Sequence, residues 1–356
     1  STPCCDCSGE GTLIPLTSAI AFRSAGILQL RYIYSMPVER IIKLFAEHGF
    51  EMNKATAHGL IKKAAGLFDL VEDVLKETVL SDNYLSMDES YYTVLTSDTN
   101  NPSGKSTAKG YIWAALANHL KLVHFFYENG SRSRKVLTGY LREDYRGAIQ
   151  SDGLGNYKII EKEAYPDAIR LSCFQHCKRK FLNITGNKDA EKIVRIINRL
   201  YQNEHRIPPD WTACQILDYR NKYAPPILKE LKEELINIKN KKSTLPKSEL
   251  SKAINYTLNE YDALCNYIRS ADYAPDKNAI ERLMRYISLS RRNSLFCGSH
   301  QGAKRAALIY SLACSCRLNN INSFEYFKDL LTKLIDINPN TDHETIRNLL
   351  PHKWQR

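Results

Sequence analysis

The arrangement of helix-like and strand-like sequence constrains the fold of this chain more than any other feature. In residues 21–80, apolar side chains recur at the three- and four-residue spacing of amphipathic helices. The next apolar stretches, 84–96 and 110–130, are instead rich in β-branched and aromatic residues, which are typical of strands. From about residue 177 the pattern is helical and strongly charged. The chain must therefore build its sheet from a short middle section and surround it with helices.

The order of elements in that middle section narrows the fold further. Three strands are followed by a helix in "SRSRKVLTGYL" and by two short buried strands in "GAIQSDG" and "AIRLSCF". This is the order of a ribonuclease H-like core, in which the first and fourth strands are neighbours and the last helix packs across them. We therefore expect an α/β fold whose ribonuclease H-like core is split by a helical insertion.

The same patterns divide the chain into segments. We expect an N-terminal helical domain with a helix-turn-helix and a C-terminal helical segment to flank the split core. The predicted segments are a partial zinc-ribbon-like leader (1–20), the helix-turn-helix domain (21–80), the first part of the core (81–176), the helical insertion (177–270), the last helix of the core (271–300) and the C-terminal helical segment (301–356).

The helix-turn-helix prediction rests on "SMPVERIIKLFAEHGFEMNKATAHGLIKKAAGLF". Pro37 suits a helix start, Gly49 suits a helix end, and Asn53 can cap a second helix. Two helices joined in this way fit a motif whose second helix enters the major groove of DNA, although an ordinary helical hairpin fits as well. The polar face of the second helix would carry Lys54, His58, Lys62 and Lys63.

Charge and composition limit the function classes. The formal net charge is +11, which suits an acidic partner such as nucleic acid, although a merely basic protein fits equally well. No run of about 18 apolar residues is present, so no membrane helix or membrane partner is expected. The start lacks both a secretion signal and a Met, so we expect a cytoplasmic bacterial protein whose true N-terminus lies upstream. The ten cysteines show no disulfide-rich pattern.

Three acidic residues are candidates for chemistry. Asp88 lies within the first predicted strand, Asp152 closes "GAIQSDG", and Glu281 begins the helix of "DKNAIERLMRYISLSRRNSLF". In the expected core these acids would meet although they are far apart in sequence. Carboxylates of this kind bind Mg²⁺ or Mn²⁺, and two such ions promote phosphodiester cleavage.

Structural interpretations of the same acids stay open. Asp152 before Gly153 suits a turn, and Asp88 can be ordinary strand polarity. Glu281 can close a capping box with Asn278 or pair with an arginine one turn later. The arginines around it are candidates for DNA phosphate contacts: Arg282, Arg285, Arg291 and Arg292.

Two cysteine-containing motifs are less specific. In "CFQHCKRKF", Cys173 and His176 resemble half of a zinc site, while His176 beside Lys178, Arg179 and Lys180 can instead position a phosphate or a DNA strand. A buried, hydrogen-bonded histidine is an equal alternative. At the N-terminus, Cys4 and Cys7 form at most a partial Zn²⁺ site.

Several long motifs, in order, resemble the DDE transposases of the insertion sequence 66 family. "MDESYY" is similar to the family's "ADETPV", "QSDGLGNY" to "QTDGYAGY", and "CFQHCKRKF" to "CWAHARRKF". "LPKSELSKAINYTL" is similar to "LPKSxLGKAIxYxL", and "PDKNAIERLMRYISLSRRNSLFCGS" to "IDNNAAERxxRPxxxGRKNWLFAGS". The chain ends in "LLPHKW", where the family has "LLPxxW". Lys277 departs from the pattern by replacing the first asparagine of "DNN".

The resemblance implies a fold, a site and a reaction. Asp88, Asp152 and Glu281 would be the metal-binding catalytic triad, with His176 as a further catalytic candidate. Two Mg²⁺ or Mn²⁺ ions would support cleavage at transposon ends and transfer of the 3′-hydroxyl to target DNA. By analogy we expect a homodimer or higher multimer, together with accessory proteins of the same element. A catalytically silent DNA-binding protein and a metal-dependent nuclease on the same fold are the alternatives.

Overall fold

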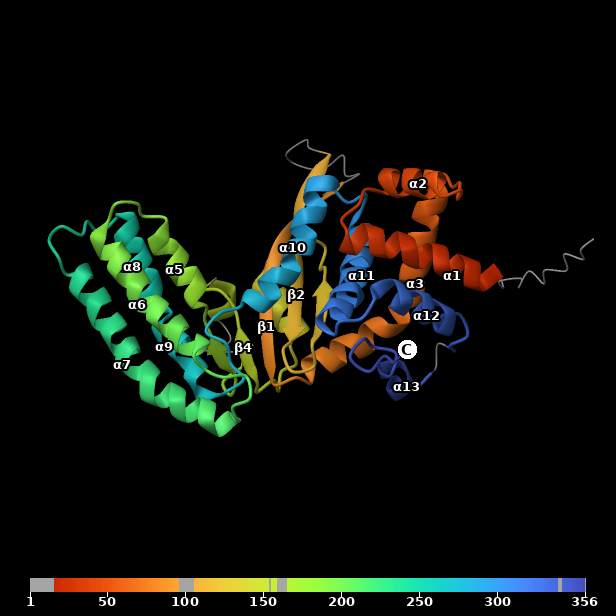
Figure 1. The fold of residues 1–356 in the computed structure, drawn as a ribbon. Helices are drawn as coiled ribbons and strands as arrows, with labels where there is room; N and C mark the ends of the chain where they lie inside the picture. The colour runs from red at the N-terminus through yellow and green to blue at the C-terminus, as the bar shows by residue number, and fades with distance from the viewer. Residues whose placement is uncertain (1–15, 96–105, 154, 159–164, 339–340, 356) are drawn as a thin grey trace, which may run out of the picture.

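The computed structural model describes residues 16–95, 106–153, 155–158, 165–338 and 341–355 of the 356-residue chain. It is a mixed α/β structure in which helices precede, interrupt and follow one sheet (Figure 1). None of the helices within those ranges is long and apolar enough to cross a membrane.

The N-terminal part is helical, as predicted. Asn53 begins the long helix by accepting a hydrogen bond from the Thr56 backbone N–H at 2.8 Å, which confirms its expected capping role. Gly49 has a φ of +80° directly after the preceding helix, a conformation that glycine adopts without strain. The elements are α1 (Leu16–Leu28), the π-helix η1 (Gln29–Ile33), α2 (Val38–Glu47) and α3 (Lys54–Leu80).

The sheet has five strands in the order β3-β2-β1-β4-β5. β1 pairs antiparallel with β2 and parallel with β4, and β4 pairs parallel with β5. The strands are β1 (Tyr84–Leu95), β2 (Thr107–Ala117), β3 (Leu122–Phe126), β4 (Ala148–Gln150) and β5 (Ile169–Leu171), with α4 (Arg134–Tyr140) and the 3₁₀ turn η2 (Gly155–Lys158) in the connections. The first and fourth strands are therefore neighbours.

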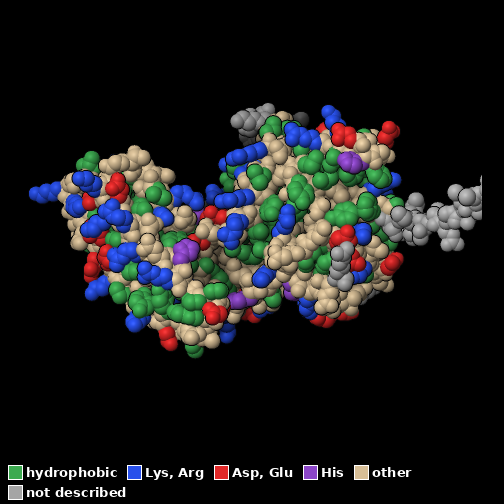
Figure 2. Space-filling view, in the orientation of Figure 1, with side chains coloured by type: hydrophobic (Ala, Val, Ile, Leu, Met, Phe, Trp, Pro, Cys, Tyr) green, Lys and Arg blue, Asp and Glu red, His purple; other side chains and the backbone are tan. Residues whose placement is uncertain are grey.

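A group of helices follows β5 and lies to one side of the sheet; we call α5–α9 the helical unit (Figure 1). It has its own apolar cluster, which includes Phe181, Ile197 and Leu231. Ser248 caps α8, as predicted from the sequence. In the space-filling view a hollow separates this unit from the rest of the molecule (Figure 2). Its elements are α5 (Phe174–Leu182), α6 (Lys188–His205), α7 (Ala213–Lys239), α8 (Glu249–Asn259), α9 (Tyr261–Cys265) and η4 (Asn266–Arg269).

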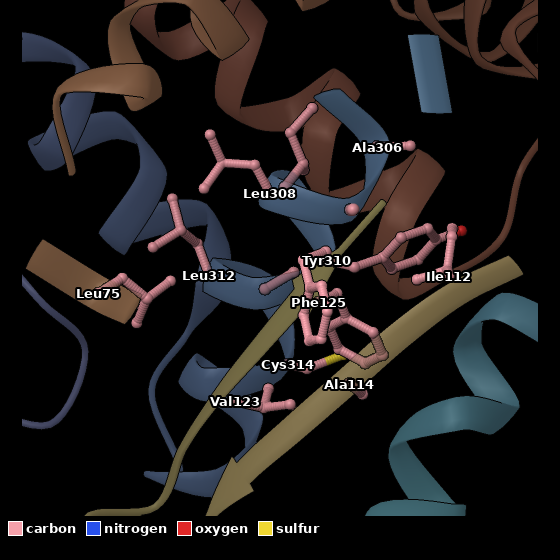
Figure 3. Packing of buried hydrophobic residues seen from close by; sticks show 14 of the residues in the cluster. Leu75, Ile112, Ala114, Val123, Phe125, Ala306, Leu308, Tyr310, Leu312 and Cys314 are labelled. Carbon is pink, nitrogen blue, oxygen red and sulfur yellow. The ribbon is translucent and has the colours of Figure 1, made fainter. Parts of the chain in front are cut away.

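The chain then returns to the sheet. α10 packs against β1, and α11 packs between β3 and α3. Figure 3 shows this core, where Tyr310 and Leu312 of α11 lie with Phe125 of β3 and Leu75 of α3. Ser315 accepts a hydrogen bond from the Val123 backbone N–H at 3.0 Å, which ties α11 to the edge strand. The last helices are α10 (Asn278–Asn293), α11 (His300–Leu318), α12 (Ser323–Ile335) and α13 (His343–Arg347).

Candidate active site

Two acidic residues meet because β1 and β4 are parallel neighbours. Ser86 of β1 lies opposite Gln150 of β4, so Asp88 and Asp152 both follow this pair by two residues. Their side chains are 16% and 24% exposed. Both face the ammonium of Lys277, whose Nζ lies 2.8 Å from Asp88 Oδ1 and 4.0 Å from Asp152 Oδ2. The two carboxylates therefore share one buried cation.

Glu281 reaches the same region from the first turn of α10. Its Oε1 lies 3.5 Å from His176 Nδ1, and its Oε2 lies 3.7 Å from the Arg179 guanidinium. Burial raises the pKa of Glu281, against the opposing charge of Lys277. Lys277 occupies the N-cap position without a side-chain cap, so Glu281 is not part of a capping box. Among the described residues no ion pair joins Glu281 to Arg285. Neither structural alternative for Glu281, the capping box or the arginine pair, is therefore present in that part of the chain.

Lys277 is the member of this site that sequence reasoning did not assign. Its side chain is only 1% exposed. Burial alone disfavours its charge, but the charges of Asp88 and Asp152 outweigh that effect and raise the pKa of Lys277. The ammonium is therefore fixed in its charged state at neutral pH. The sequence signalled this lysine only by placing it where the family pattern "DNN" has its first asparagine.

The Cys-x-x-His motif lies directly beside these acids. The ligand atoms of Cys173, His176 and Glu281 lie within 4.8 Å of one another. Burial lowers the pKa of His176 to about 4, helped by the charge of Lys277, and burial raises the pKa of Cys173 to about 11. At neutral pH the imidazole is therefore neutral and the thiol is protonated.

The comparison with known families decides which class of protein this is. The sequence profile described as "Transposase IS66 family" matches residues 20–305. The chain belongs to the IS66 family of transposases. Among curated proteins it resembles three from Sinorhizobium fredii (strain NBRC 101917 / NGR234), named "Uncharacterized protein" y4jD, y4hP and y4qI.

The similarity to these relatives extends over much of this chain. Identity is 27% over 353 residues for y4jD, 27% over 247 for y4hP and 24% over 331 for y4qI. The matches cover 95%, 64% and 89% of this chain, but 66%, 42% and 60% of the relatives. This IS66-family chain thus spans less than two thirds of the length of the curated relatives it matches.

The residue after Asp88, Glu89, also has a structural role that sequence reasoning did not predict. The Glu89 side chain is 2% exposed and accepts hydrogen bonds from Arg132 at 2.7 Å and from the Tyr157 hydroxyl at 2.9 Å. Burial raises the pKa of Glu89, against the opposing hydrogen bond from Arg132. Two consecutive acids in a strand sequence with no other charged residue were the available signal. In the IS66-family chain Glu89 therefore holds Arg132 and Tyr157 beside the strand that carries Asp88.

The predicted DNA-contacting cations divide into two groups on the surface. Arg291 stacks on the Tyr91 ring at 3.7 Å and donates to Ser90 Oγ and to the Tyr91 carbonyl, so it is engaged by β1. Lys180 lies over the Tyr256 ring at 4.2 Å. Figure 2 shows Lys and Arg side chains gathered over α10, beside the hollow. The exposed predicted residues of the α5 and α10 group are Arg179, Lys180, Arg282, Arg285 and Arg292, with Lys178 partly buried.

The second group lies on α3, far from the acids in sequence. His58, Lys62 and Lys63 are exposed, and Lys54 is exposed while paired with Glu39. Lys54, His58 and Lys62 line a cavity of about 740 Å³ together with residues of the segment after α10. The candidate partial Zn²⁺ site, Cys4 and Cys7, lies outside the described residues.

Proposed function

We propose that this IS66-family chain is a DNA transposase that cleaves phosphodiester bonds at insertion-sequence ends and joins the 3′-hydroxyl ends to target DNA. The observation that supports the proposal is the approach of three acids from separate segments to the buried ammonium of Lys277. Asp88 lies in β1, Asp152 follows the adjacent parallel strand β4 by two residues, and Glu281 comes from the helix packed on β1. These would be the DDE triad, with His176 beside them.

A ribonuclease H-like core is the fold we propose for this site. It is supported by the sheet order, in which β1 has the antiparallel β2 on one side and the parallel β4 on the other. The core would comprise 81–176 and 271–300, interrupted by the helical insertion 177–270. The helix-turn-helix domain would be 21–80, with α3 as the helix that enters DNA.

The donor atoms of the site fit a hard divalent cation by type. Asp88, Asp152 and Glu281 offer carboxylate oxygens, which Mg²⁺ and Mn²⁺ prefer. Glu281 Oε1 is buried and has no hydrogen-bond partner among the described residues, with His176 Nδ1 3.5 Å away, which suits a metal-ligand atom. Divalent ions held there would activate the attacking hydroxyl and stabilise the leaving oxygen.

The surrounding side chains would bind and orient the DNA. The exposed guanidinium and ammonium groups of α5 and α10 suit backbone phosphates at the mouth of the hollow. His176 is neutral at pH 7, so it can hydrogen-bond a phosphate-bound water or hydroxyl without adding charge. The partners would be transposon-end and target DNA, a second copy of the chain and accessory proteins, in the bacterial cytoplasm.

The decisive experiment compares the parent with Asp152→Asn on labelled DNA that carries the ends of the encoding element. With Mn²⁺, we expect Asp152→Asn to lower cleavage by about 100-fold or more, since a ligand is lost, while DNA binding is retained. Asp144→Asn is the matched control because that carboxylate is 69% exposed and lies on the surface. Equal cleavage by parent and Asp152→Asn would refute the assignment.

The products separate the alternatives. Joined target DNA identifies a transposase, whereas cleavage without joining identifies a nuclease on the same fold. Tight end binding without cleavage by the parent identifies a silent DNA-binding protein. The buried Lys277 among the acids is the observation that gives this last alternative its weight.

A further inference from the structure

Burying the Lys277 ammonium costs free energy, which its attraction to two nearby carboxylates offsets. Moving an ammonium group from water into a protein interior is strongly unfavourable unless it is paired. Lys277 is 1% exposed, and Asp88 at 2.8 Å and Asp152 at 4.0 Å are the carboxylates within ion-pair distance among the described residues. The lysine and the two acids therefore form a single buried charge cluster.

The ammonium occupies one of the two Asp88 oxygens that a divalent ion could use. Its Nζ lies at hydrogen-bond distance from Asp88 Oδ1, while a bound Mg²⁺ lies about 2.0–2.1 Å from its carboxylate oxygens. A metal ion on the same oxygen would sit within a few ångströms of a like charge. With Lys277 present, the formal charge of the three side chains is −1, compared with −2 for the two acids alone. Both effects weaken the attraction for a divalent ion.

We propose that Lys277 is a built-in cation that competes with divalent metal for Asp88 and Asp152. This inference rests on the proposed metal-binding role of the two aspartates. In the parent protein Lys277 neutralises one of the two negative charges, so metal binds tightly only when the ammonium withdraws. A neutral side chain at position 277 removes this competition and strengthens metal binding.

The local backbone allows this to be tested by substitution. Lys277 is the N-cap residue of α10, but its side chain makes no capping hydrogen bond. The turn is instead braced by Asp276, which accepts from the Asn278 backbone N–H at 3.0 Å and from the Asn278 side chain at 2.8 Å. A change at Lys277 therefore alters the charge cluster and leaves the bracing of α10 in place.

The experiment measures Mn²⁺ binding to the full chain without DNA, by calorimetry and by the electron paramagnetic resonance of free Mn²⁺. We expect Lys277→Asn to bind Mn²⁺ at least about tenfold more tightly than the parent, because one like charge is removed beside the ion. At the same Mn²⁺ concentration, Mn²⁺ added to an EDTA-stripped sample should also raise the Tm of Lys277→Asn more than that of the parent, since tighter binding to the folded state stabilises it more. Lys304→Asn is the control, since that lysine is 55% exposed and pairs with Glu72.

The outcomes separate this inference from the proposed function. If the parent binds Mn²⁺ as tightly as Lys277→Asn and Asp152→Asn weakens both, the metal site stands and the built-in cation is refuted. If folded Lys277→Asn binds no Mn²⁺, both the proposed metal site and the competing role of Lys277 are refuted. Should Lys277→Asn not fold, Lys277→Gln, with a longer neutral amide, is held to the same tenfold criterion.

Discussion

A buried ion pair joins the sheet to the helical unit, and its removal gives the sharpest stability prediction. Glu260 lies at the junction of α8 and α9, and its Oε2 accepts from Arg170 of β5 at 2.6 Å. The two side chains are 1% and 2% exposed. Ser172 Oγ donates to the same oxygen at 3.0 Å.

The expected magnitude follows from the geometry of the pair. The two groups are 2.6 Å apart and buried, and breaking such a pair by neutralising one partner costs about 3–5 kcal/mol because the other charge is left uncompensated. The substitution Glu260→Gln removes this attraction but keeps a neutral hydrogen bond to Arg170, which contributes about 1 kcal/mol. We therefore expect the free energy of unfolding to fall by about 3 kcal/mol, which is typical of breaking a buried pair.

The assay is urea unfolding followed by far-UV circular dichroism, with a matched surface pair as control. Glu230 accepts from Arg199 at 2.7 Å, but these side chains are 44% and 48% exposed, so Glu230→Gln should cost at most about 1 kcal/mol. The reasoning is refuted if the two variants lose the same stability. Replacing both partners, as Arg170→Met with Glu260→Leu, should recover most of the loss, because Lys158, whose ammonium lies 3.1 Å from Glu260 Oε1, is 36% exposed and stays solvated.

Two further predictions concern a buried histidine and a crowded glycine. Burial lowers the pKa of His124 from 6.5 to about 3, so the unfolded chain binds this proton first and stability falls as the pH drops from 7 to 5. The contribution is about 2 kcal/mol, and His124→Gln should lose that much less stability over this interval in urea titrations at the two pH values. Gly153→Ala would place its Cβ 2.6 Å from the Tyr256 hydroxyl, which forces a shift beside Asp152. End cleavage should fall at least about tenfold. Gly139→Ala, whose Cβ meets nothing within 4 Å, should cleave at the parental rate; equal loss in both variants would contradict the steric argument.

Local sequence signals predicted the elements well. The caps at Asn53 and Ser248 were predicted from their side chains and the apolar faces that follow them, and the structure confirms both. The strands over 84–130 were recognised because β-branched and aromatic residues replace the helical spacing. Such features depend on residues a few positions apart, which is why the sequence reveals them. Asp88 and Asp152 were expected to be neighbours because the order of strands and helices along the chain matches a fold in which the first and fourth strands are adjacent.

The sequence by itself determined the helices, the strands, their order and the positions of the three acids. Only the tertiary structure decided which charges surround them. It buries Lys277 between Asp88 and Asp152, and it holds Arg291 on Tyr91. These contacts join residues that are up to about 200 positions apart. Periodicity records which face of an element is buried, but the partner of a buried charge depends on how distant elements pack, and no local pattern carries that information.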